Sequence, residues 1–257
     1  METLRTHVLF EVHRDLPRAG PGHDGSTRRA LARVLAAPAA APPRVVLDVG
    51  CGPGMQTREL ARALPEACIL AADLYEPFLR RLAESRAAGD GPAARVLPIR
   101  ADMGRLPVAG ASVDLVWCEG AAYILGVERS LAVWRQLLRP DGACAFTEAV
   151  WLRPEPPDEL RRFWEVYPAM GDVPHTRELV RRAGFELLED FVLPRTAWWE
   201  HYYEPMSERV ALLERRYRDD PAALEALAGC RREIDVYRRF GDWYGYAFFV
   251  ARRTRGA

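Results

Sequence analysis

Residues 45–54, with the sequence VVLDVGCGPG, decide the fold of this chain. The aliphatic run ending in Asp48 is typical of a buried strand in a parallel sheet. Three glycines follow at alternate positions and allow a tight turn in which no Cβ keeps a ligand from the backbone. Residues 55–64 are expected to form a helix, which places the turn at the carboxyl edge of the sheet. Nucleotide-like ligands bind at such edges, so the stretch predicts a nucleoside-cofactor site.

The spacing of the glycines distinguishes a dinucleotide site from a site for other nucleoside cofactors. A dinucleotide fingerprint has its third glycine three residues after the second, where this chain has Met55. Asp48 would also repel a pyrophosphate, whereas it suits a ligand that carries a positive charge. Both residues weigh against a nicotinamide-dependent oxidoreductase, and tight binding of NADH would contradict this interpretation.

Further strands are expected downstream of the glycine loop, and candidate ligand-binding residues lie at the ends of the second and third strands. Residues 68–73 (CILAAD) end in an acid roughly 20 residues after the glycine loop, the spacing of a carboxylate that binds a ribose diol. Residues 95–100 are expected as a third strand, followed by Asp102 and Met103. The remaining expected segments are a fourth strand at 112–119 (SVDLVWCE), a turn at 137–142 (LLRPDG) and a fifth strand at 143–150.

In this order the motifs resemble those of the class I S-adenosylmethionine-dependent methyltransferases, over about residues 44–150. The segment 16–27 (LPRAGPGHDGST), the W-x-E-G-A-x-Y pattern at 117–123 and the Trp198-Trp199 pair extend the resemblance to nearly the whole chain. They resemble a bacterial small-molecule group described as ubiquinone/menaquinone-type or methyltransferase-domain proteins. The resemblance implies an α/β, Rossmann-like, seven-stranded and mostly parallel sheet, with an N-terminal helical segment and a C-terminal helical and aromatic cap insertion.

The resemblance also implies S-adenosylmethionine as the cofactor and S-adenosylhomocysteine as its product. Asp73 would bind the ribose and Leu74 would lie against the adenine, with Asp102 on the adenine amino group and Met103 packed on the ring. Structural alternatives remain open, because Asp73 could cap a helix, Asp102 could begin a turn, and Met103 could fill the core. The full set of expected cofactor-binding residues is Asp48, Gly50, Cys51, Gly52, Gly54, Thr57, Asp73, Leu74, Asp102, Met103 and Glu119.

Four residues are candidates for catalysis of an in-line methyl transfer, in which positioning and water exclusion provide much of the rate enhancement. Glu119 ends the fourth expected strand, Tyr123 lies about one helical turn later, and Glu148 ends the fifth. Either carboxylate could accept a proton or hold a cationic substrate; alternatively, Glu119 only orients the cofactor and Glu148 caps a loop. His201 is the fourth candidate, as a base that titrates in the working range.

Aromatic residues are concentrated in the last part of the chain, where 18 of the 25 Phe, Trp and Tyr residues follow position 150. Residues 198–203 (WWEHYY) are the strongest candidates for the wall of an acceptor pocket, because Trp and Tyr combine broad apolar faces with a polar tip. An ordinary aromatic core is the alternative. The expected pocket residues are His13, Arg18, Trp151, Tyr167, Trp198, Trp199, Tyr202 and Tyr203.

Composition restricts the class of protein. Lys+Arg and Asp+Glu both number 36, so the net charge of zero disfavours nucleic acid as a partner. Every basic residue other than histidine is an arginine, which excludes a lysine Schiff base and the lysine of a phosphate-binding P-loop. The five cysteines form no close pair, which disfavours a disulfide framework and a zinc site and favours a reducing compartment. We expect a cytoplasmic protein with no metal and no membrane span.

Three segments are expected: an N-terminal helical lid at 1–43, a cofactor-binding core at 44–150, and a C-terminal half at 151–257 that completes the sheet and adds the cap. Ser26 or Thr27 is expected to cap the first helix before the core, and 36–43 (AAPAAAPP) to form a linker. The predicted function is methyl transfer to O or N of a small organic acceptor. The alternatives are a non-methylating enzyme of the same cofactor, such as an aminopropyl transferase, and a non-catalytic binding protein.

Overall fold

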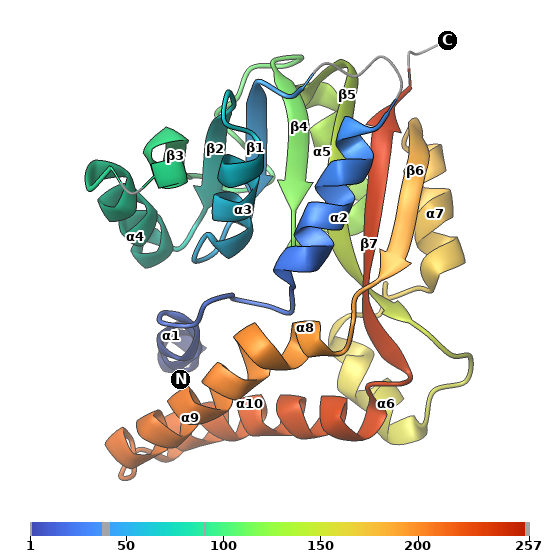
Figure 1. Ribbon diagram of the computed structural model, residues 1–257. Coiled ribbons are helices and arrows are strands. Elements are labelled where there is room, and N and C mark those ends of the chain that lie inside the picture. Colours follow the sequence, from blue (N-terminus) through green and yellow to red (C-terminus); the bar gives the residue numbers. More distant parts are fainter. Residues whose placement is uncertain (1, 38–41, 90, 255–257) are drawn as a thin grey trace.

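A seven-stranded sheet of order β3-β2-β1-β4-β5-β7-β6 crosses the protein (Figure 1). The computed structural model describes residues 2–37, 42–89 and 91–254, with side chains from residue 6 onward, so part of the expected linker lies outside the described residues. The strands are β1 (Val45–Val49), β2 (Cys68–Asp73), β3 (Val96–Arg100), β4 (Val113–Cys118), β5 (Leu138–Trp151), β6 (Phe185–Val192) and β7 (Tyr244–Arg253).

The strand pairing is parallel except at β7, which pairs antiparallel with both β5 and β6. The strands β1 to β4 begin and end within two residues of the sequence-based expectation. The fifth begins earlier than expected, at Leu138, because the expected turn is incorporated into β5 and pairs with Val113 of β4. Asp141 provides the local bend there, with a φ of 65°.

Helices cover both faces of the sheet. One face, whose core includes Leu31, Leu60 and Leu79, is covered by α2 (Asp24–Leu35), α3 (Met55–Ala63) and α4 (Glu76–Ala87). The other face, whose core includes Leu131 and Val180, is covered by α5 (Val127–Leu137) and α7 (Val173–Arg182). Because both faces are covered, β1 and β4 carry near-continuous aliphatic runs rather than an alternating pattern.

A further layer of helices lies beyond the carboxyl ends of the parallel strands, at the bottom of Figure 1. It contains α1 (Glu2–His13), which packs against α9 (Glu204–Arg216) and α10 (Pro221–Phe240). Between β6 and β7 the chain forms α8 (Thr196–Trp198), η4 (Trp199–Tyr203), α9 and α10, which confirms the expected cap insertion. The short elements η1 (Gly91–Arg95), η2 (Ala122–Ile124), α6 (Asp158–Phe163) and η3 (Trp164–Val166) complete the chain.

The start of α2 differs from the expectation. The helix begins at Asp24 with His23 at the N-cap, so neither Ser26 nor Thr27 caps it. Both lie in the first turn, and the Thr27 hydroxyl instead donates to Glu119 at 2.7 Å. The Thr27 hydroxyl, which local rules assign to helix capping, therefore donates to Glu119, a residue distant in the sequence.

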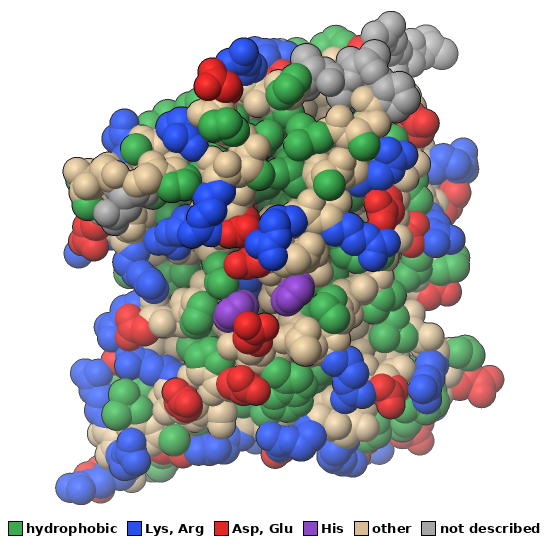
Figure 2. Space-filling model, viewed as in Figure 1, with side chains coloured by type: hydrophobic (Ala, Val, Ile, Leu, Met, Phe, Trp, Pro, Cys, Tyr) green, Lys and Arg blue, Asp and Glu red, His purple; other side chains and the backbone are tan. Residues whose placement is uncertain are grey.

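The outer surface carries both charge signs. Figure 2 shows arginine and acidic side chains interspersed over the face viewed in Figure 1, as the net charge of zero suggests. Among the described residues, no helix has the length and apolarity needed to cross a membrane.

Candidate active site

A cavity of about 580 Å³ opens between the carboxyl ends of β1, β2 and β4 and the helix α1. Its volume lies in the range of pockets that hold drug-sized ligands. The sheet contributes the glycine loop and the residues that follow β2, β3 and β4, and the N-terminal segment contributes residues of α1 and of the loop after it. Its lining includes Leu9, Phe10, His13, Arg18, Gly50, Cys51, Gly52, Gln56, Asp73, Leu74, Phe78, Asp102, Met103, Glu119 and Tyr123.

The glycine loop after β1 forms one wall of the cavity. Gly50 has a φ of 68°, and a Cβ at this position would lie 2.5 Å from the Cβ of Ala121, so no larger residue fits. The amides of Gly50 and Cys51 both donate to the Ala72 carbonyl, at 2.8 and 3.0 Å. The loop is therefore tied to the end of β2, and its backbone forms the cavity wall directly.

Asp73 stands at the end of β2, on the floor of the cavity. One carboxylate oxygen accepts from the Gly52 amide at 2.9 Å and the other from the Tyr75 amide at 2.8 Å. Each oxygen of an ionised carboxylate has a second lone pair, so Asp73 retains the capacity to accept hydrogen bonds from a diol. It lines the cavity, as the ribose prediction requires.

An apolar compartment adjoins Asp73. Leu74 and Met103 line it from the sheet side, and Phe10 lines it from the side of α1. The Phe10 ring stacks on Tyr75 with ring centroids 4.4 Å apart. Asp102 lies at its edge, where its carboxylate also accepts from the Gly104 amide at 2.7 Å. Asp102 therefore forms a turn, the open alternative, and lines the cavity at the same time.

Asp48 and Thr57 lie behind the glycine loop and not on the cavity surface. The Thr57 hydroxyl donates to one oxygen of Asp48 at 2.5 Å, and the other oxygen has no partner among the described residues. Burial raises the pKa of Asp48 to about 7, against the opposing effect of the Thr57 hydrogen bond. The pair supports the loop from beneath, and direct contact of either side chain with a cofactor remains a prediction.

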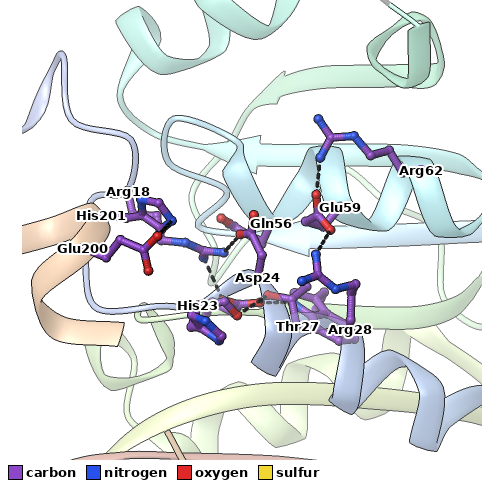
Figure 3. A network of polar contacts seen from close by, with 12 residues as sticks. Arg18, His23, Asp24, Thr27, Arg28, Gln56, Glu59, Arg62, Glu200 and His201 are labelled. Carbon is purple, nitrogen blue, oxygen red and sulfur yellow. Dashed lines mark hydrogen bonds and ion pairs between the residues drawn. The ribbon is translucent and has the colours of Figure 1, made fainter. Parts of the chain in front are cut away.

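A buried ion pair joins the N-terminal segment to the end of β4. Arg18 donates to Glu119 at 2.9 Å and to Asp24 at 2.8 Å, and the side chains of Arg18 and Glu119 are 4% and 3% exposed. Glu119 also accepts from the Trp117 indole at 2.9 Å and from Thr27. Figure 3 shows Arg18 extended toward Asp24 at the start of α2. A carboxylate with three donors is held in one orientation, and its role as a base remains a prediction.

Two polar side chains of this region, Arg18 and Gln56, line the cavity. The buried Nε of Arg18 has no hydrogen-bond partner among the described residues, and Arg18 lines the cavity. Gln56 also lines it, while its amide donates to the Cys51 carbonyl at 2.9 Å. An unpaired guanidinium N–H in a cavity wall suits a carboxylate ligand.

Tyr123 marks the far end of the cavity, beyond Glu119. Its ring lies 5.9 Å from that of Tyr167, centroid to centroid. Behind these rings lies Glu148, which is 3% exposed and whose carboxylate oxygens have no hydrogen-bond partner among the described residues. Burial raises the pKa of Glu148 to about 7, while the Tyr167 phenol has the opposite effect. Glu148 does not belong to the cavity lining, so its catalytic role remains a prediction.

The predicted aromatic wall lies largely in the core. Trp198 is 3% exposed and stacks on Tyr237 with centroids 4.1 Å apart. Tyr202 and Tyr203 are buried beside it, and their hydroxyls donate to Glu233 of α10 at 3.2 and 3.1 Å. None of the predicted wall residues Trp151, Tyr167, Trp198, Trp199, Tyr202 and Tyr203 lines the cavity. The structure assigns them a packing role, and the acceptor-wall role remains a prediction.

The predicted histidines separate in space. His13, at the end of α1, lines the cavity, and its Nδ1 lies 2.7 Å from the Leu9 carbonyl. His201 lies in η4 next to Glu200, with 3.6 Å between Nε2 and the carboxylate, and it is not part of the lining (Figure 3). A base at His201 therefore lacks direct access to the cavity as the chain is arranged here, and that role remains a prediction.

Several residues of this site escaped sequence reasoning. Phe10, Phe78 and Gln56 line the cavity, while Thr27 and Glu233 hold buried polar contacts. Phe10 and Glu233 sit on helices whose contacts with the sheet depend on the tertiary arrangement, so no local motif identifies them. Gln56 could have been found, because it lies two residues after the last glycine of the loop, Gly54.

Comparison with known proteins places these features in a family. Residues 46–142, from β1 through the turn within β5, match the sequence profile of a family described as Methyltransferase domain. The chain is a class I S-adenosylmethionine-dependent methyltransferase. The methyltransferase uses S-adenosylmethionine as its cofactor. The quinone-type subgroup is not confirmed by the relatives.

Three similar proteins illustrate the relationship. An uncharacterized methyltransferase of Bacillus subtilis, YodH, is 24% identical over 221 residues, covering 85% of this chain and 88% of YodH. A malonyl-[acyl-carrier protein] O-methyltransferase of Legionella pneumophila is 30% identical, over 72% of this chain but only 59% of its own length. A methyltransferase structure from Geobacter sulfurreducens, in complex with S-adenosyl-L-homocysteine, shares the fold with a TM-score of 0.80 at 21% identity, over 95% of this chain and 97% of that one.

Proposed function

We propose that this methyltransferase transfers a methyl group to an oxygen or nitrogen atom of a small organic acceptor. The observation that carries the proposal is the cavity, whose lining includes both Asp73 and Tyr123. The bound cofactor supplies an activated methyl group on a sulfonium. The protein then has to position the acceptor and exclude water, which the covering helix α1 and the buried ion pair at Arg18 favour.

The cavity residues fit this cofactor. The steric requirement at Gly50 leaves backbone in the wall, and the Asp73 carboxylate has free lone pairs for the ribose. Phe10, Leu74 and Met103 would enclose the adenine between apolar surfaces. The unpaired Nε of Arg18 would receive the carboxylate of the methionine part.

The residues near the reacting atoms would be Glu119 and Tyr123. Glu119 already accepts from Arg18, Thr27 and Trp117, which favours an orienting role over that of a base. Tyr123 lines the cavity and lies where an acceptor would enter. We therefore expect E119Q to reduce cofactor binding and turnover together, whereas a base would lose turnover alone.

The proposal assigns a role to each of the three segments of the chain. Residues 44–150 would bind the cofactor, residues 1–43 would cover it, and residues 151–257 would shape the acceptor region. The Legionella pneumophila relative is named for O-methylation of a malonyl group on acyl carrier protein, and such an acceptor belongs in any screen.

A titration tests the proposal first. The purified protein is titrated with S-adenosylmethionine, S-adenosylhomocysteine and NADH in a calorimeter. Micromolar binding of the first two and none of NADH is the expected result, followed by label transfer from methyl-labelled cofactor to one acceptor of a small-molecule panel. Binding without transfer to any acceptor would support the binding-protein alternative, and tight NADH binding would refute the assignment.

A further inference from the structure

Two carboxylates, the buried Glu148 and the half-buried Glu233, lie outside the cavity lining, beyond its Tyr123 end. Glu148 of β5 is 3% exposed and its oxygens have no hydrogen-bond partner among the described residues. Glu233 of α10 accepts from Tyr202 and Tyr203, both through the same oxygen. Neither acid is needed for the cofactor contacts proposed above.

Tyr123 links these two acids to the cavity. Its side chain is 46% exposed and its ring lies 5.9 Å from that of Tyr167, while desolvation of the phenol and the negative charges of Glu233 and Glu148 raise its pKa. Tyr246 experiences the same two charges, and its ring lies 3.7 Å from the position that a Cβ on Gly120 would occupy. Gly120 and His13 line the cavity: the Gly120 amide donates at 2.8 Å to Thr147, the neighbour of Glu148, and the His13 ring lies 6.0 Å from that of Tyr202, which donates to Glu233.

No arginine balances this charge. Among the described residues, no ion pair involves Glu148 or Glu233, although the chain forms many others. Burial raises the pKa of Glu233, and the one nearby group that lowers it through charge is His13. Unpaired acids in an apolar setting are unfavourable unless they serve a ligand or remain protonated.

We propose that the Tyr123 end of the cavity, with Glu148 and Glu233 beyond it, binds the ammonium group of an organic amine, which makes the acceptor an amine and the methylated atom its nitrogen. The inference rests on the proposed function and names its substrate class. Tyrosine faces attract cations, and two carboxylates in a low-dielectric wall strengthen that attraction. The same charges would repel a carboxylate acceptor such as a malonyl group.

The transfer balances with an amine. The bound ammonium loses one proton to the medium and becomes a neutral amine, whose lone pair forms the new N–C bond. The C–S bond of the cofactor breaks and its electron pair stays on sulfur, so the products are S-adenosylhomocysteine and an N-methyl ammonium. Substrate and product are therefore both cations at this site, and only the attacking amine is neutral.

Matched probes test the inference on the protein saturated with S-adenosylhomocysteine. The probes combine three bodies (phenethyl, indolylethyl and octyl) with an amine, an alcohol or a carboxylate, and binding is measured by calorimetry. We expect at least one amine to bind at least tenfold more tightly than its alcohol, with the carboxylate weakest. Any other order, including no binding by any amine, overturns the inference. Failure to bind S-adenosylhomocysteine would instead refute the proposed function, so the two failures are distinguishable.

Substitutions then test the two acids. E148Q and E233Q are each expected to weaken binding of the best amine about tenfold while S-adenosylhomocysteine still binds normally, which shows that the variant is folded. The matched control is E225Q, which removes an exposed acid from the same helix α10 and leaves amine affinity within twofold. Unchanged amine affinity in both E148Q and E233Q would overturn the inference.

Discussion

The Asp73 carboxylate has two roles: it fixes the backbone of the glycine loop, and it faces the cavity. D73A removes the acceptor for the Gly52 and Tyr75 amides as well as the proposed ribose contact. We expect binding of S-adenosylhomocysteine to weaken by about 1–3 kcal/mol, the range for a lost buried hydrogen-bonding partner. Calorimetry measures the loss, and E76Q, an exposed acid on α4, is the control. Wild-type affinity in D73A would place the ribose contact elsewhere.

Glu148 gives the folded protein a specific pH dependence. Its pKa rises from 4.5 when unfolded to about 7 when folded, because burial disfavours the charged form. The folded state therefore holds more protons between these values, and the stability that the protonated acid contributes is lost as the pH rises through about 7.

E148Q removes this dependence. The variant should match the wild type near pH 4.5 and exceed it at pH 8 by about 3 kcal/mol, the free-energy equivalent of a shift of this size. Urea denaturation of both proteins across the pH range measures the difference, with E225Q as the control. A difference that stays constant with pH would contradict the assignment to Glu148. Asp48, whose pKa is also raised to about 7, adds the same dependence to both proteins and cancels in the comparison.

At the scale of the elements, the N-terminal segment is held to the sheet through Arg18. R18M leaves Glu119 as a buried charge without its cation, a change that costs about 3–5 kcal/mol in buried pairs. We expect faster amide hydrogen exchange in α1 and α2, because these helices flank the lost contact. Adding E119Q should restore part of the protection. R14M, which removes an exposed pair with Asp15, should change little.

Trp198 lies in α8, next to η4. Its substitution distinguishes a packing role from a role in an acceptor pocket. W198A creates a cavity against Tyr237 and Tyr244, and a large-to-small change at a buried Trp costs about 3–5 kcal/mol. Chemical denaturation should show this loss while S-adenosylhomocysteine affinity is preserved. Full stability combined with lost acceptor binding would instead support the wall role.

Over the whole molecule, the cavity couples ligand binding to stability, because its walls come from the sheet and from α1. Saturation with S-adenosylhomocysteine at about a hundred times its Kd should stabilise the protein by about 2.7 kcal/mol. The melting temperature should rise by about 5–10 °C at this chain length. NADH at the same concentration is the control, and an equal rise with NADH would argue against a site for the sulfonium cofactor.

The sheet and its glycine loop could be predicted because their determinants are local. The aliphatic run before Asp48 and the alternate glycines specify a strand and a turn by themselves, and the order of the later strands follows the chain. The start of α2 could not be predicted, because its N-cap is His23, whose side chain makes no capping hydrogen bond, while the Thr27 hydroxyl contacts Glu119, 92 residues away, as well as the His23 carbonyl.

The sequence by itself determined the α/β class, the position of the cofactor loop and the acid Asp73, since backbone geometry and strand periodicity depend on neighbouring residues. Only the tertiary structure decided which side chains face the cavity. It brought Arg18 to Glu119 across 101 residues and buried Trp198 in the core. It also brought Glu233 of α10 to the hydroxyls of Tyr202 and Tyr203. These outcomes depend on how helices pack on the sheet, where burial and charge are set by residues far apart in the chain.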